Sequence, residues 1–207
     1  VLFGASDTVL VDCGYPGSLH LLEKELRDHN IDPSDLTKLV LTHQDDDHMG
    51  AAYELKERYP AIQILASHIE EPYISGKVKN LRLQQAEEMQ ASLPANQKSW
   101  GEQFIDRLRS LNPIKVNLAL HAGDRFDWAG GCEIVETPGH TPGHISIRSL
   151  HHDFIITGDA AVLEGDHFVV ANPQYSLDLE TAKKSLVTIL SYPCNLYICY
   201  HGGIYTP

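Results

Sequence analysis

The chain has 207 residues, of which 43% are hydrophobic, so it is long enough to bury a core of its own. No stretch approaches the roughly 18 apolar residues that a membrane-spanning helix needs, so we expect no membrane partner. The net charge of −12 argues against a nucleic-acid partner, because Lys and Arg supply most of the affinity for phosphates. We expect one domain over residues 1–207, with an N-terminal piece missing before its first strand.

The first part of the chain alternates strand and helix signals. Apolar runs that end in turn residues predict strands, and apolar residues at helical spacing predict the helices between them. In chain order these are a strand over 8–14, a helix over 17–30, a strand over 38–42, a helix over 49–59 and a strand over 62–67. The predicted order is therefore βαβαβ.

Residues 69–112 differ from the segments on either side. They are polar and helix-prone, and Pro94 interrupts them. A helical insertion between core strands often forms a lid or one wall of a substrate pocket. A peripheral helical hairpin without such a role is the alternative.

The second half of the chain consists mainly of short strand signals. They fall at 115–120, 124–129, 132–138, 144–150, 153–159 and 167–171, before a helix over 177–191 and a last strand that begins at 196. Strands and helices in both halves predict two facing sheets flanked by helices. The four cysteines show no CxxC spacing, so we expect buried free thiols of a cytoplasmic protein, with one disulfide as the alternative.

Metal-capable side chains follow four of the predicted strands. The densest run, residues 43–48, reads HQDDDH, and carboxylates this close repel one another. The run is therefore either a metal site or a fully solvated acidic loop. His140, Asp159 and His201 follow three later strands, and strand ends of one sheet converge in space, which favours the metal site. Nitrogen and oxygen donors without thiolate suit zinc, iron or manganese.

The motifs THQDDDHMG, TPGHTPGH, TGDA and YHGG occur in this order, after TVLVDCG near the start of the chain. Their order and separation resemble those of the metallo-β-lactamase-fold hydrolases, which include glyoxalase-II-type thioesterases and lactonases. The resemblance extends over almost the whole chain. It implies an α/β fold of the α+β kind, a four-layer αβ/βα sandwich in which two mixed sheets are flanked by helices.

The resemblance also implies a dinuclear centre, with two divalent ions that we expect to be zinc, iron and manganese being the alternatives. His43 and His140 would hold the first ion, and Asp159 would bridge the two. Asp47, His48 and His201 would hold the second ion. Asp12 matches the aspartate that braces metal-binding histidines in this family.

Asp45 departs from the family pattern, in which a second histidine stands at this position. Three interpretations remain open: Asp45 ligates the first ion, it contacts that ion through water or holds a neighbouring ligand, or it leaves that site weakly filled. If Asp45, Asp47 and Asp159 all ligate, the centre carries one positive charge fewer than the usual set. We therefore expect a more alkaline activity profile, which Asp45→His should shift toward acid.

The expected function is hydrolysis of an ester-like bond in a small molecule, a lactone, ester or thioester, by a metal-activated hydroxide. Asp47 and Asp159 would orient the nucleophile or carry a proton, and Tyr175 would donate to the developing oxyanion or pack in its loop. A di-iron oxidoreductase of the flavodiiron type and a metal-binding protein without turnover are the alternatives. The sequence leaves the oligomeric state open, with a homodimer among the states that it allows.

Two neighbours of the predicted ligands are expected to play no part in ligation. His144 falls outside the family's ligand set and is predicted to begin a strand. Asp46 lies on the opposite side of its loop from the ligands, so we expect it to face solvent or to accept hydrogen bonds from backbone amides.

Overall fold

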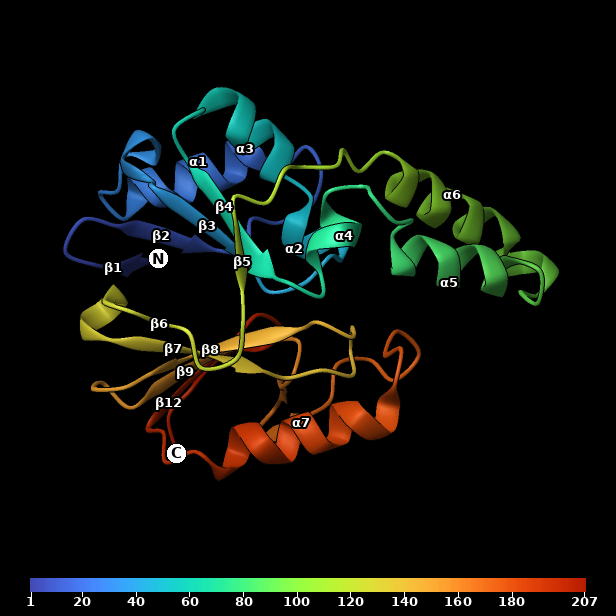
Figure 1. The fold of residues 1–207 in the computed structure, drawn as a ribbon. Helices are drawn as coiled ribbons and strands as arrows, with labels where there is room; N and C mark the ends of the chain where they lie inside the picture. Colours follow the sequence, from blue (N-terminus) through green and yellow to red (C-terminus); the bar gives the residue numbers. More distant parts are fainter.

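The computed structural model describes all 207 residues and places two β-sheets face to face, with helices on their outer sides (Figure 1). The prediction of a sandwich of two mixed sheets flanked by helices is therefore confirmed. No helix has both the length and the apolar character that crossing a membrane would require.

The first sheet has five strands in the order β1-β2-β3-β4-β5. They are β1 Leu2–Phe3, β2 Thr8–Val11, β3 Lys38–Leu41, β4 Gln63–Ser67 and β5 Leu118–Leu120. β1 is antiparallel to β2, and the other pairings are parallel. The crossover helices are α1 Leu19–Asp28 after β2 and the short α2 Asp46–Met49 and α3 Ala52–Arg58 after β3.

The second sheet has six strands in the order β13-β12-β9-β8-β7-β6. They are β6 Arg125–Phe126, β7 Cys132–Glu136, β8 Ile145–Ser149, β9 Phe154–Gly158, β12 Leu196–Cys199 and β13 Gly203–Tyr205. Only β9 and β12 pair in parallel. A separate hairpin of β10 Val162–Glu164 and β11 His167–Val169 follows β9, and α7 Leu179–Ser191 covers the outer face of this sheet.

Three apolar layers hold the sandwich together, and the alternation of side chains along β3 shows how. Leu39 and Leu41 point outward and pack against α1 and α3, whereas Val40 points inward, toward the second sheet. The inner layer includes Ile134 and Ile147 from the second sheet. A third layer lies between that sheet and α7. Strands covered on both faces read as nearly continuous apolar runs, as KLVL does.

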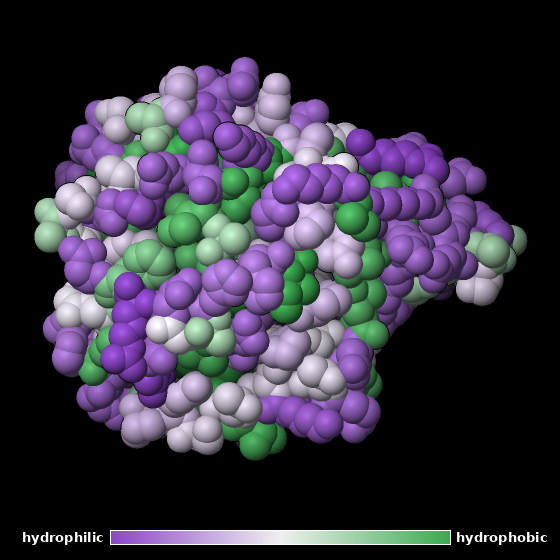
Figure 2. All heavy atoms as spheres, in the orientation of Figure 1, coloured by the Kyte–Doolittle hydropathy of each residue, from purple (hydrophilic) through white to green (hydrophobic).

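The segment between β4 and β5 projects from one side of the sandwich (Figure 1). It contains α4 Glu71–Ile74, α5 Leu81–Gln90 and α6 Lys98–Arg109. α5 and α6 pack on each other through a small apolar cluster of Ala86, Ile105 and Leu108. Figure 2 shows that the outward surface of these helices is largely hydrophilic, in keeping with the polar sequence of 69–112.

All four cysteines are buried and free, as the sequence predicted. Short 3₁₀ turns at Pro33–Asp35, Ala95–Gln97 and Trp128–Gly130 complete the structure.

Candidate metal centre

The HQDDDH run occupies the turn between β3 and α2. The backbone and side chains of this turn are held by Asp12, which follows β2 and adopts a positive φ of 56°. The Asp12 carboxylate accepts hydrogen bonds from the Thr42 amide and hydroxyl, both at 2.8 Å, and lies 2.8 Å from His48 Nδ1. A non-glycine residue in this conformation is strained, and such strain gathers at functional sites. Asp12 therefore orients His48 so that its Nε2 lies near the carboxylates of Asp159 and Asp47.

His140 reaches the same place from the second sheet. It follows β7 and the turn at Gly139, whose φ is 127°. A Cβ on Gly139 would lie 2.1 Å from the Ala182 amide nitrogen, so only glycine lets this turn press against the first turn of α7. Asp159 follows β9, and His201 follows β12.

The predicted ligand residues meet in two groups. In the first group, one ligand atom each of His43, His140 and Asp159 lie within 4.8 Å of one another. In the second group, Asp47, His48 and His201 do the same. All but His201, which is 43% exposed, are largely buried.

Asp159 faces both groups. Its Oδ1 lies 3.2 Å from His48 Nε2 and 3.6 Å from His201 Nε2, and its Oδ2 lies 3.4 Å from His140 Nε2. Burial alone would raise the pKa of Asp159, but the surrounding histidines, His48 foremost, lower it. The carboxylate is therefore held ionised between the two groups.

Unpaired buried atoms test whether these residues suit metal ions. His43 Nε2, His48 Nε2 and Asp159 Oδ1 are buried and have no hydrogen-bond partner. Buried polar atoms are nearly always paired, so several such atoms at one place call for a ligand. Imidazole nitrogen and carboxylate oxygen are the donors that zinc, iron and manganese take. The arrangement fits metal ions.

Asp45 lies beside the first group and also pairs with an arginine that none of the sequence interpretations included. Its Oδ2 is 3.0 Å from His140 Nε2 and 3.5 Å from His43 Nε2. The guanidinium of Arg82, from α5, lies on the same carboxylate, with Nη2 at 2.6 Å and Nε at 3.1 Å from Oδ2. Burial would raise the pKa of Asp45, but Arg82 and the two histidines hold it well below its usual range.

The expectation for Asp46 is wrong. Its carboxylate is 4% exposed and forms a 2.6 Å ion pair with Arg107 Nε, from α6. Burial raises the pKa of Asp46 in spite of this partner. The segment turns into α2 at this residue, so a face that would be open on an extended loop meets the projecting helices instead.

His144 supports the centre from beneath. Its Nε2 accepts a 2.9 Å hydrogen bond from the Asp159 amide, so its proton sits on Nδ1 and is donated to Thr137 Oγ1 at 2.8 Å. Burial and the nearby His43 lower the pKa of His144 well below its usual value, which keeps it neutral. Both of its nitrogens are used within the protein, and neither is free for a metal ion.

Glu70 joins the two loops that carry the first group. This fully buried carboxylate accepts hydrogen bonds from the Gln44 amide and side chain, both at 3.1 Å, and from the Gly143 amide at 2.8 Å. Burial raises the pKa of Glu70 to about 7. On the other side of the centre, the Tyr200 hydroxyl donates to the Asp47 carbonyl, and its ring packs on that of His48 at 3.9 Å.

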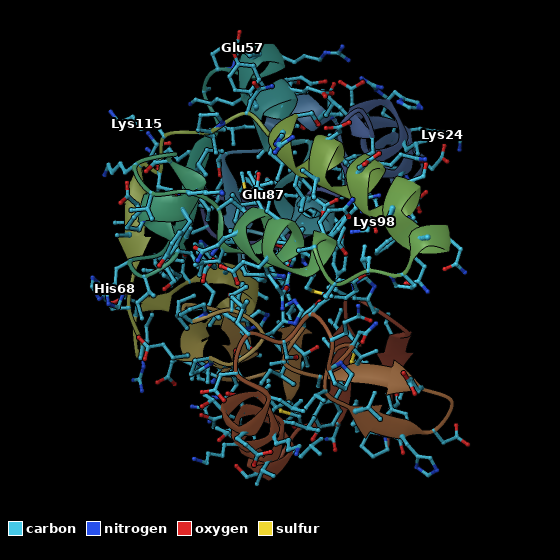
Figure 3. The ribbon with its side chains drawn as sticks, turned by 90° about the vertical axis from the view of Figure 1, so that its right-hand side faces the viewer. Lys24, Glu57, His68, Glu87, Lys98 and Lys115 are labelled. Carbon is cyan, nitrogen blue, oxygen red and sulfur yellow. The ribbon has the colours of Figure 1, made fainter.

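A cavity of about 750 Å³ opens above the two groups. Its floor includes Asp45, Asp47, His140, Asp159 and His201. One wall comes from α5 and α6, and the opposite wall from residues 162–175, which include the β10–β11 hairpin and Tyr175. Figure 3 looks onto this side, with Glu87 marking α5, Lys98 marking the start of α6, and the orange hairpin below them. Five of the predicted ligands thus line the bottom of an accessible pocket.

The family model of the metallo-β-lactamase superfamily matches residues 1–201. The chain belongs to the metallo-β-lactamase superfamily. The family resemblance seen in the sequence is therefore confirmed.

Individual members of the metallo-β-lactamase superfamily are only distantly similar. The probable metallo-hydrolase YflN of Bacillus subtilis is 25% identical over 217 residues, which cover 94% of this chain and 75% of YflN. The hydroxyacylglutathione hydrolase GloC of Haemophilus influenzae is 31% identical over 127 residues, 60% of this chain and 49% of GloC. Among solved structures, the metallo-β-lactamase family protein TTHA1429 of Thermus thermophilus superposes with a TM-score of 0.70 at 20% identity, over 99% of this chain and 68% of that one.

Three residues that contact the predicted ligands or their loops could not be recognised from the sequence: Arg82, Glu70 and Tyr200. Arg82 and Glu70 lie in the polar segment 69–112, where charged side chains are expected in solvent. Tyr200 directly precedes a predicted ligand, and that position was the one local signal available. The other two are brought to the centre only by folding.

Proposed function

We propose that this protein is a metal-dependent hydrolase that cleaves an ester-like bond, in a lactone, ester or thioester, of a small molecule. The observation that carries this proposal is the meeting of two potential ligand groups at Asp159, on the floor of an open cavity. Membership of the superfamily and the similarity to a hydroxyacylglutathione hydrolase support it.

The first group would hold one divalent ion and the second group another, with zinc as the proposed metal. Such ions would supply Lewis acidity toward the scissile carbonyl and would lower the pKa of a coordinated water. Asp159 faces both groups, so its two oxygens can fix the separation of the groups. Asp12 keeps His48 oriented, and His144 keeps the Asp159 backbone in place.

Asp47 and Asp159 are the carboxylates that can orient the attacking water and receive its proton. Asp47 Oδ2 lies 3.1 Å from His201 Nε2 and 3.6 Å from His48 Nε2. Burial would raise the pKa of Asp47, but the hydrogen bond from His201 and the charge of His48 lower it. An ionised carboxylate on the cavity floor can accept a proton from water and pass it to the leaving group.

The cavity wall suggests a neutral substrate with an apolar acyl part. Trp100, Phe104 and Tyr175 form an aromatic side, and Val169 and Val170 lie opposite. The cavity's two arginines, Arg82 and Arg107, are already paired with carboxylates, so neither is free to bind a substrate anion. Tyr175 is half-buried on this wall, and we propose that its hydroxyl donates to the developing oxyanion.

The decisive experiment is a hydrolysis panel of lactones, esters and thioesters with short and long acyl chains, run with zinc-loaded protein and with chelator. We expect hydrolysis that stops with chelator, restarts with zinc and favours the apolar acyl chains. Phe104→Ala should raise KM for the long-chain substrates about 10-fold and leave short-chain substrates almost unchanged. Tyr175→Phe should lower kcat with little change in KM.

Bound metal without hydrolysis of any panel member would overturn the proposal in favour of a metal-binding protein. Iron as the main metal, with oxygen consumed in the presence of a reductant, would overturn it in favour of an oxidoreductase.

A further inference from the structure

Arg82 is a cation built into the candidate metal centre. Its side chain is 2% exposed, although Arg is among the residues that are least often buried. Its Nε lies 3.2 and 3.1 Å from the two oxygens of Asp45, and its Nη2 lies 2.6 Å from Oδ2. Its remaining nitrogen, Nη1, donates to the Tyr175 carbonyl and to Gln85. The guanidinium is thus fixed in position on three sides.

The fixed guanidinium touches the first group. Arg82 Nη2 lies 3.3 Å from His140 Nε2, and the Asp45 oxygen that it binds lies 3.5 Å from His43 Nε2. A metal ion held between these two imidazoles would lie close to the fixed positive charge of Arg82. It would also compete with Arg82 for the Asp45 carboxylate. Like charges at such distances repel strongly inside a protein.

The second group has no such neighbour. The ion pairs of Asp47 are with His48 and His201, and no Lys or Arg pairs with it. Behind His48 stands a carboxylate, that of Asp12, which makes the imidazole a better donor toward a metal ion. Only the first group therefore has a buried arginine beside it.

We propose that Arg82 is a positioning residue that competes with a metal ion for Asp45 and makes the first group the weaker of two unequal metal sites. This inference rests on the metal ligation assumed in the proposed function, but not on hydrolysis. It also accounts for the aspartate at position 45, because a histidine there would leave a buried guanidinium without its counter-ion.

The test is the affinity of each ion, measured as the zinc retained per chain when the zinc-loaded protein is dialysed against buffers of increasing chelator strength. The wild type should lose its ions in two steps. His43→Ala should remove the step at weak chelator and keep the other, which assigns the weak step to the first group.

Arg82→Met should raise the affinity for the weakly held ion about 10- to 100-fold and leave the affinity for the tightly held ion unchanged. Arg82→Lys keeps the positive charge, so its weak step should stay near that of the wild type. Arg107→Met is the matched control: it removes an arginine from the same cavity that pairs with Asp46 instead, and both steps should stay unchanged.

Arg82→Met leaves the Asp45 carboxylate buried, so its folding is checked by circular dichroism. Asp45→His combined with Arg82→Met removes both charges and restores the family's usual donor, and it should give two ions of similar, tight affinity. A single step in the wild type, or a first site that Arg82→Met weakens in folded protein, would overturn the inference. Two unequal steps in a protein that hydrolyses nothing would uphold it while the proposed function fails.

Discussion

The first and second groups of the candidate centre use similar side chains in different surroundings. The second group is backed by the Asp12 carboxylate and opens toward solvent at His201. The first group is buried more deeply, and Asp45 beside it is bound by Arg82. The difference teaches that the charge of a metal centre depends on residues outside its motifs as much as on the donors within them.

Arg82 changes the net charge that the sequence predicted for the centre. Three carboxylates against two divalent ions would leave one positive charge fewer than a set with histidine at position 45. Arg82 adds one positive charge in direct contact with Asp45, which offsets this difference. The alkaline shift expected from Asp45 is therefore reduced or cancelled as long as Arg82 is present.

Asp159→Asn breaks both groups at once and should have the largest effect. The amide keeps the size of the side chain but loses the charge that faces His48 and His140. We expect kcat/KM for any ester-like substrate to fall on the order of 1,000-fold. Elemental analysis should show fewer ions per chain, and retention of both ions with full activity would contradict the bridging position.

Asp45→Asn changes the surroundings of the first group alone, because only that group lies next to Asp45. It leaves the Arg82 guanidinium buried without a counter-ion, and breaking a buried pair costs about 3–5 kcal/mol of unfolding free energy. Denaturant unfolding should show a loss of this order. Arg82→Met combined with Asp45→Asn should regain most of it, and an equally unstable double variant would mean that the pair is not the cause.

Glu70→Gln tests how the pH dependence of stability arises from the carboxyl group that joins the two loops of the first group. The pKa of Glu70 is about 7 in the folded protein, above its ordinary value of 4.5. Its contribution to stability is therefore fully present below pH 4.5 and is lost as the pH rises through 7. Relative to Glu70→Gln, the wild type should lose roughly 2–3 kcal/mol over this range. Parallel stability curves for the two proteins would contradict this.

Asp12→Asn affects the second group and should have the smallest effect. It weakens the contact that orients His48, and loss of such a partner typically costs 10- to 100-fold in metal affinity. Chelator competition should show a weakened strong step and an unchanged weak step. Equal weakening of both steps would mean that Asp12 acts on the whole loop through Thr42.

The sequence predicted the two-sheet fold because strands with alternating or continuous apolar side chains can pack in few ways. Strand ends also marked the residues that meet in the two groups. The predicted helix over 49–59 is instead α3 Ala52–Arg58, preceded by the separate α2 Asp46–Met49, because Ala51 between them has a non-helical ψ of 1°.

The partners of Asp45 and Asp46 could not be predicted from the sequence. Arg82 and Arg107 lie in polar helices far along the chain, and nothing in their local sequence distinguishes them from solvated arginines. Only the docking of α5 and α6 beside the sandwich brings them to the HQDDDH run. Long-range pairing of this kind leaves no local pattern.

Neighbouring acids of one turn are thus each bound by an arginine from a different helix of the projecting hairpin, Asp45 by α5 and Asp46 by α6. The hairpin of α5 and α6 therefore cannot be exchanged without changing the ion pairs of these two acids. Protein engineers who graft another member's hairpin onto this scaffold to alter selectivity would have to transplant both arginines with it, or neutralise both acids beforehand.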